Sequence, residues 1–276
     1  MVAVVVLTMT GCGDNGATPK PDAKVDVTDG GCEPGPDAAP SGKPLGDVSG
    51  TWAIVEISHA LVTGPLSSVQ ISRELYTYTV TQTGQDLQIV EQICDIHVDS
   101  EDDSEHTRFL PSLWANLPAV NRLGKLVDGG GGVFTFTTEK TYRTRGITMT
   151  DPAVDPMPDT DSGVTDPRVE DWDMDSHPGI TLLLSGILRG QAYVVQRDFN
   201  VYNGKQSSPD QMEGITTWGS DQTYIGSDPD AIAKLNISAS PDGAHPERDT
   251  FMLVRVPAGS NCAFVVANQC QLFNGK

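Results

Sequence analysis

The sequence predicts an all-β fold: one antiparallel meander closed into a single barrel, with a β-sandwich as the alternative. Three observations lead to this fold class. About ten short segments alternate apolar and polar residues or are continuously apolar, and turn residues separate them at regular spacing. Only one region has helical character. A meander that closes on itself also removes exposed sheet edges, which favours the barrel.

Composition excludes one class of partner. The chain has 276 residues, enough for one large β domain, and a hydrophobic content of 38% supplies a core. Its net charge of −19 repels phosphate backbones, so nucleic acid is not an expected partner. The same charge attracts cations, including Ca²⁺, and it also keeps a secreted protein soluble.

Residues 1–12 are expected to be a lipoprotein signal segment. The apolar run Val2–Met9 is well under the ~20 residues that a membrane-spanning helix needs, and it is typical of a secretory signal. The next residues, Met9-Thr10-Gly11-Cys12, resemble the lipobox of bacterial lipoproteins. This resemblance implies that Cys12 is acylated and anchors the protein in the bacterial outer membrane or cell surface. The alternative is a buried apolar N-terminus with an ordinary cysteine.

Residues 13–47 are predicted to be a disordered tether. The segment from Gly13 to Gly46 holds six Pro and seven Gly and no aromatic residue, so it cannot bury enough apolar area to offset chain entropy. It would hold the domain off the membrane surface. Cys32 lies inside it and is a candidate for fixing the end of the tether to the domain.

Residues 48–276 are expected to form the all-β domain. Gly50-Thr51-Trp52 opens the first strand, and the alternating segments Glu74–Thr83 and Leu87–Ile96 flank a turn signal at residues 83–86, which predicts a hairpin. The helical region is placed within Arg108–Val127, where Pro111 suits a first helical turn. The remaining predicted strands are Gly132–Thr138, Glu139–Thr150, Ile180–Leu188, Ala192–Tyr202, Glu213–Trp218, Gln222–Ile225, Ala233–Ser240, Thr250–Val256 and Asn261–Ala267.

The start of the domain resembles one known family. A Gly-x-Trp at the head of the first strand, here Gly50-Thr51-Trp52, resembles the lipocalin and calycin barrels. In those families the Trp closes the barrel floor and stacks on an Arg of a late strand. Arg255 in the segment FMLVRV is the candidate partner. The resemblance implies a hollow barrel that binds a small hydrophobic ligand, with Trp52 and Arg255 among the ligand-binding residues.

The segment 151–177 is predicted to be a long acidic loop with a metal site. It holds nine acids, one Arg and four Pro, and no periodicity. Asp171-x-Asp173-x-Asp175 resembles the opening of EF-hand-type Ca²⁺ loops, because closely spaced carboxylates supply the oxygen ligands that calcium needs. Ser176 stands where those loops have Gly, and Leu182 where they have Glu. Further ligands would come from residues such as Asp159, Asp161, Asp166 or Glu170, and the alternative is a solvated acidic loop.

Arg197 is a further candidate ligand contact. It shares a row with Tyr193, Val195 and Phe199 on the predicted strand, and a charge on an apolar row needs a partner. The alternative is a salt bridge to one of the many acids.

The cysteines favour a local disulfide. Cys262 and Cys270 are close in sequence, so we expect them to pair, with Cys94–Cys262 as the competing bridge.

No catalytic motif is present, so an enzyme is not expected. The first functional hypothesis is a lipid-anchored β-barrel that binds a small apolar or amphipathic ligand, and a barrel without a cavity of ~300 Å³ would exclude it. The second is a cell-surface structural or interaction module whose acidic loop takes Ca²⁺. A secreted hydrolase is a third class, which clustered carboxylates with perturbed pKa values in a deep cleft would support.

Overall fold

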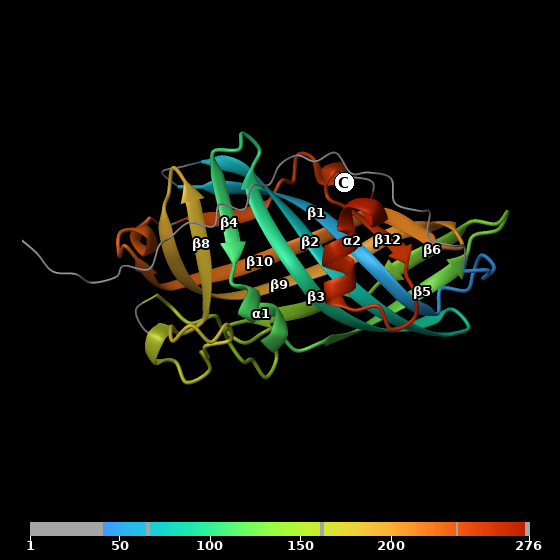
Figure 1. The fold of residues 1–276 in the computed structure, drawn as a ribbon, viewed down its shortest axis with the longest axis horizontal. Helices are drawn as coiled ribbons and strands as arrows, with labels where there is room; N and C mark the ends of the chain where they lie inside the picture. The colour runs from blue at the N-terminus through green and yellow to red at the C-terminus, as the bar shows by residue number, and fades with distance from the viewer. Residues whose placement is uncertain (1–40, 65–66, 161–162, 236, 274–276) are drawn as a thin grey trace, which may run out of the picture. The chain divides into compact units, whose positions relative to one another are not determined.

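The computed structural model describes residues 41–64, 67–160, 163–235 and 237–273. Within these ranges, twelve strands form one antiparallel sheet, which confirms the all-β prediction (Figure 1). The strands are β1 (Gly50–Thr63), β2 (Ser68–Thr83), β3 (Asp86–Ser100), β4 (Glu105–Phe109), β5 (Val120–Asp128), β6 (Phe134–Thr138), β7 (Thr141–Arg145), β8 (Ile180–Gly186), β9 (Gly190–Ser208), β10 (Gln211–Asp228), β11 (Ser238–Pro241) and β12 (Thr250–Arg255). The helices are α1 (Pro111–Asn116) and α2 (Cys262–Phe273), with 3₁₀ turns at Gly163–Thr165, Ile232–Lys234 and Pro246–Arg248.

The sheet partly closes into a ring of eight strands. Its order is β10-β12-β1-β2-β3-β4-β8-β9, and β9 pairs with β10 to complete the circuit. We call this circuit the ring. Strands β3 and β9 are long enough to be joined a second time, through β5 and β6 at the other end of the ring. Between the two connections β7 pairs with β9 alone, so this part of the wall is not continuous.

The predicted hairpin at the start of the domain is confirmed. Strands β2 and β3 pair from Thr83 and Asp86 at the turn to Gln70 and Ser100, with one register shift between Leu75 and Tyr76. Gly84 at the turn has a φ of 63°, a backbone conformation that glycine adopts without steric cost.

Strand β10 is continuous through Gly219-Ser220-Asp221, the turn residues between the predicted strands Glu213–Trp218 and Gln222–Ile225. Its pairing with β9 extends along almost the whole of both strands, and this tertiary partner overrides the local turn signal. Gly219 is needed there for another reason. A Cβ at this position would lie 2.6 Å from the ring of Phe199 on β9, so glycine lets that ring pack across the strand.

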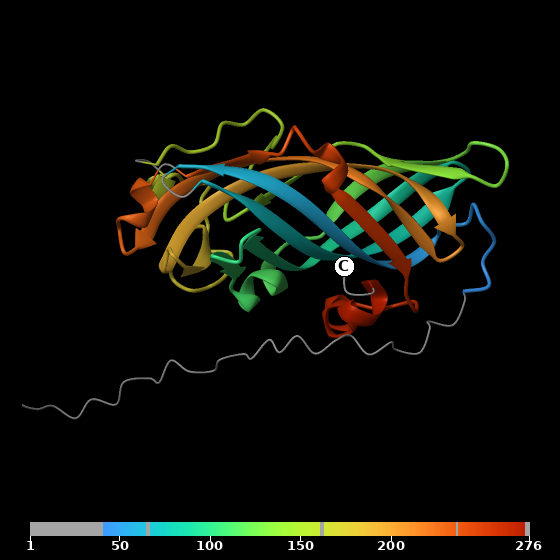
Figure 2. The ribbon, with the colours of Figure 1, turned by 90° about the horizontal axis from the view of Figure 1, so that it is seen from above.

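Helix α2 replaces the last predicted strand, Asn261–Ala267. It packs on the outer face of the ring (Figure 2). Val265 and Phe273 are buried there in a cluster that includes Val55 and Leu75. Asn261 accepts a hydrogen bond from the backbone NH of Phe264 at 3.1 Å, as residues that precede a helix often do. The expected helix in Arg108–Val127 is limited to α1, because the chain returns to strand β5 after Pro118.

The favoured disulfide prediction is wrong, and the competing pair forms. Cys94 on β3 bonds Cys262, with Cα atoms 4.9 Å apart. Cys262 and Cys270 both lie on α2, eight residues apart, which at 1.5 Å per residue is about 12 Å and beyond the reach of a disulfide. Cys270 is also disulfide-bonded.

The domain begins before the predicted boundary at residue 48. The Gly46 NH donates to Gln206 on β9 at 2.8 Å, and its carbonyl accepts from Gln82 on β2 at the same distance. Residues 41–47 therefore lie against the ring. Residues 13–40 of the predicted tether, the signal segment and Cys12 lie outside the described residues.

Candidate ligand cavity and acidic loop

Apolar side chains fill the interior of the ring at its β5–β6 end. The buried members are Trp52, Ile54, Val80, Leu87, Ile89, Leu126, Phe136, Met212, Phe251 and Leu253. The guanidinium carbon of Arg255 lies 4.2 Å from the centroid of the Trp52 ring, and the two residues are register partners on β1 and β12. The structure thus brings together the pair that the family resemblance singled out, at the filled end.

Polar and charged side chains form the next layer of the interior. We call Glu56, Tyr76, Tyr78, Glu91, Arg122, Arg143, Arg145, Asp198, Asn200 and Tyr202 the buried polar layer; each is less than 9% exposed. Arg122 pairs with Glu91 at 2.8 Å, and Arg143 bridges Glu91 and Asp198 at 3.2 and 2.7 Å. Because these charges are paired, their burial is tolerated. Burial opposes ionisation of Glu91, but Arg122 and Arg143 outweigh it and hold the pKa of Glu91 below its usual range.

Glu56 has the least favourable position for a charge in this layer. It accepts hydrogen bonds from Tyr202 Oη at 2.6 Å, Asn200 Nδ2 at 2.8 Å and Thr216 Oγ1 at 3.0 Å, all neutral donors. Burial first, and then the negative charge of Glu74, raise the pKa of Glu56 to about 7.

Beyond the buried polar layer the ring is hollow. A cavity of about 680 Å³ occupies the β4–β8 end, well above the ~300 Å³ that a small-ligand site needs. Strand β2 shows the sequence of layers: Ser68, Gln70 and Ser72 line the cavity, Glu74 marks its floor, and Tyr76 belongs to the polar layer. The interior is therefore filled at one end and hollow at the other.

The cavity wall is amphipathic. Its aliphatic and aromatic part comes mainly from β3, β4 and β8, with Ile96, Val98, Phe109, Leu182, Leu184 and Leu188. Its polar part comes from β1, β2, β9 and β10, where Ser58, Ser72, Glu74, Gln196 and Asp198 lie. Arg145 also lines the wall, and its Nη2 has no hydrogen-bond acceptor within reach.

Arg197 also lines the cavity, but its nitrogen atoms are engaged. It pairs with Asp221 on β10 at 2.5 Å and donates to the carbonyls of Pro152 and Asp155 at 3.0 and 2.7 Å. The alternate residues of β9 that share a face with Arg197 do not point into the ring. Tyr193 and Val195 of this face pack outside the ring, under the acidic loop. Arg197 therefore holds the loop against β9. Trp52 and Arg255 do not line the cavity.

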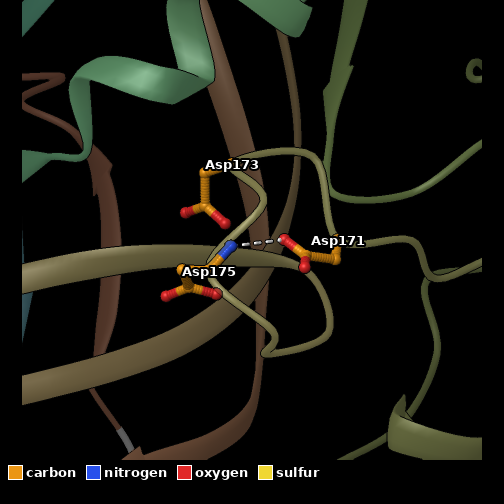
Figure 3. Close-up of side chains that lie close together, drawn as sticks. All are labelled: Asp171, Asp173 and Asp175. Atoms are coloured by element: carbon orange, nitrogen blue, oxygen red, sulfur yellow. Dashed lines mark hydrogen bonds between the residues drawn. The ribbon is translucent and has the colours of Figure 1, made fainter.

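The acidic loop brings the three predicted metal ligands together. One carboxylate oxygen from each of Asp171, Asp173 and Asp175, the acidic triad, lies within 4.8 Å of the others (Figure 3). The backbone NH of Asp175 donates to Asp171 Oδ1 at 3.2 Å. Ser176 has a φ of 76°, so the backbone turns sharply at the position where EF-hand loops have glycine.

Asp173 gives the acidic triad the chemistry of a cation site. It is 1% exposed, and its Oδ2 accepts from the Thr181 NH at 2.6 Å, while its Oδ1 is buried without a hydrogen-bond partner. Burial, followed by the charges of Asp175 and Asp171, raises the pKa of Asp173 to about 6. A divalent cation would satisfy that oxygen and neutralise the repulsion, so the triad can hold a metal ion.

Among the loop residues that the structure describes, no further acid joins the triad. Asp166 pairs with Arg168 at 2.7 Å, and Glu170 accepts from the Thr148 hydroxyl at 2.8 Å. Leu182, at the twelfth position of the Ca²⁺-loop pattern, lines the cavity instead. Asp161 lies outside the described residues.

The comparisons with known proteins assign no family. No family model, curated protein or solved structure matches the chain. Among the described residues, the helices are too short or too polar to span a bilayer.

Proposed function

We propose that this chain is a lipid-anchored, extracytoplasmic binding protein that holds a small amphipathic ligand inside a hollow, lipocalin-like β-barrel. The cavity of about 680 Å³ carries the proposal, because it lies in the range of about 300–1,000 Å³ that ligand sites occupy. Its aliphatic wall suits a hydrocarbon chain and its polar floor suits a head group. Acylation of Cys12 would moor the domain to the bacterial outer membrane or cell surface.

Binding is favoured over catalysis at this site. The one carboxyl group of the interior whose pKa is raised to about 7, that of Glu56, lies beneath the cavity floor and does not line it. Three neutral donors already occupy its oxygens. A substrate in the cavity would not reach it, so this carboxyl group gives the hydrolase hypothesis no support.

A cavity-filling variant tests the binding proposal. We expect the neutral fluorescent probe N-phenyl-1-naphthylamine to bind the domain, and Ala60→Phe, which projects a ring from β1 into the cavity, to weaken binding at least about tenfold. Leu61→Phe is the matched control, because the neighbouring residue of the same strand points out of the ring and is 38% exposed. Equal affinity in all three proteins would exclude the cavity as the site.

The anchor is tested separately. Labelling of the full chain with radioactive palmitate is expected to mark the protein, and Cys12→Ala is expected to abolish the label and release the domain from membranes. An unlabelled wild-type chain would exclude lipidation.

The second candidate function is a surface module whose acidic loop is ordered by Ca²⁺. The buried, unpartnered Oδ1 of Asp173 favours it. We expect millimolar Ca²⁺ to raise the melting temperature and Asp173→Asn to remove that shift, while Asp230→Asn, an equal change of charge away from the triad, retains it. Calorimetry without binding heat, together with an unchanged melting temperature, would exclude the site.

A further inference from the structure

We infer that the cavity selects an amphipathic amine, with a cationic head at Glu74 and an aliphatic tail along β3, β4 and β8. The inference rests on the proposed function, since it specifies the chemistry of the ligand that the cavity holds. The evidence for this ligand chemistry is the set of charged side chains that line the cavity.

Carboxylates outnumber cations on the cavity wall. Four carboxylates and two guanidinium groups line it, so its formal charge is −2; they are Glu74, Glu105, Asp198, Asp221, Arg145 and Arg197. Arg197 is paired with Asp221, and Arg145 Nη1 is paired with Asp198. The excess negative charge therefore belongs to Glu74 and Glu105.

Glu74 is the deeper of the two and has mainly neutral neighbours. Ser72 Oγ donates to it at 3.2 Å and Tyr76 Oη donates to its other oxygen. Its ion-pair partner is Arg145 Nη2, at the long distance of 3.9 Å, and Arg143 acts on it from behind the Tyr76 hydroxyl, which accepts from Arg143 Nη1. On the adjacent strand the residue directly opposite is another acid, Glu56, so this position supplies no cation to the site. An ammonium group, a compact charge with three donors, would compensate this site.

The position of the apolar wall determines where the tail of the ligand lies. Leu182 and Leu184 on β8 line the cavity and are separated from β1 and β2 in the strand order, and Val98 on β3 lies beside Ser72 of β2. A head at Glu74 thus leaves an alkyl chain to pack along this wall and be removed from water.

An anionic head fits the same geometry poorly. Arg145 Nη2 is the donor without an acceptor, but it is buried and faces Glu74. A carboxylate that approached it would meet the Glu74 carboxylate and would add a third excess negative charge to the wall.

Three ligands that share a ten-carbon alkyl chain and differ in the head group test the inference. Titration calorimetry of the domain with decylamine, 1-decanol and decanoate is expected to rank the amine tightest, by at least about tenfold over decanoate. This ranking uses the unaltered chain, so it does not depend on the folding of a variant. If none of the three binds, the proposed function fails. If decanol or decanoate binds as tightly as the amine, the cavity remains a binding site and the inference is overturned.

A variant of the head-group site sharpens the test. Glu74→Gln is expected to weaken decylamine binding about tenfold and to leave decanol binding within about twofold. Glu139→Gln removes the same charge from an exposed position between β6 and β7 and is expected to change neither affinity. An equal loss in both variants would mean that only the net charge of the chain matters, which contradicts a head group placed at Glu74.

Discussion

Glu56 and Glu74 lie directly opposite each other on strands β1 and β2, and both side chains face the interior of the ring. Like charges in this position destabilise a strand pair. Burial and this neighbour together raise the pKa of Glu56 to about 7, whereas its ordinary value is 4.5. The pair makes the stability of the domain depend on pH near neutrality.

The first prediction concerns that dependence. The folded chain keeps the Glu56 proton up to about pH 7, while the unfolded chain releases it above 4.5, so this contribution to stability is full below pH 4.5 and is lost as the pH rises to about 7. The difference between the pKa values of Glu56 in the folded and unfolded chain corresponds to about 3 kcal/mol in the free energy of unfolding. Glu56→Gln should therefore be more stable than wild type at pH 8 by up to about 3 kcal/mol, and similar to it at pH 4.5. Urea unfolding at both pH values measures the difference; a difference that is the same at both would contradict the assignment.

The second prediction concerns the ion pair of Arg122 with Glu91 in the buried polar layer. Arg122→Leu leaves Glu91 with Arg143 as its cationic partner and removes the bond to the Asn200 carbonyl. We expect a loss of about 3–5 kcal/mol in the free energy of unfolding, because a buried charge loses compensation. Lys125→Leu on the same strand removes an exposed cation paired with Asp86 and should change little. Similar losses in the two variants would argue against an energetic role for the layer.

The third prediction concerns the disulfide between Cys94 and Cys262. The bridge joins residues 168 positions apart, so it constrains the unfolded chain strongly. Replacing both cysteines by Ala should cost about 2–5 kcal/mol and should accelerate hydrogen exchange in α2 more than in β2. Uniform acceleration throughout the domain would show that α2 does not depend on the bridge for its docking.

The fourth prediction concerns Arg255 at the filled end. Its guanidinium group donates to the carbonyls of Ser49 and Asp47 at 2.6 and 2.7 Å while it stacks on Trp52. Lysine cannot donate to both carbonyls from a planar group that stacks on Trp52. Arg255→Lys should therefore lower the free energy of unfolding by about 1–3 kcal/mol. Arg189→Lys at an exposed turn is the control. Equal stability of Arg255→Lys and wild type would mean that the guanidinium geometry contributes nothing beyond its positive charge.

Patterns confined to neighbouring residues were predictable. The alternation in β2 and β3 has the period of two that strands require, and Gly84 marks their turn. The acidic triad was found for the same reason, since its members are two residues apart and one turn of the loop brings them together.

Features that depend on distant segments were not predictable. Helix α2 is short and apolar, and such a run is consistent with strand or helix until its packing partner is known. The buried polar layer draws between one and three residues from each of six strands, so no local motif marks it. A weak signal was present: Arg122 alternates with exposed Asn121 and Leu123 and shares its face with Leu126, which places a charge in the core row. The cavity is a property of the assembled ring and has no local signature.

The pairing of β1 with β12 has a consequence for how the protein is made. A nascent chain presents Trp52 and its neighbours long before Arg255 and the rest of β12 leave the ribosome. During that interval one edge of β1 lacks its partner strand β12. An unpaired strand edge promotes association with other chains. Biogenesis of this protein should accordingly depend on holdase chaperones, and chains truncated before residue 250 should aggregate.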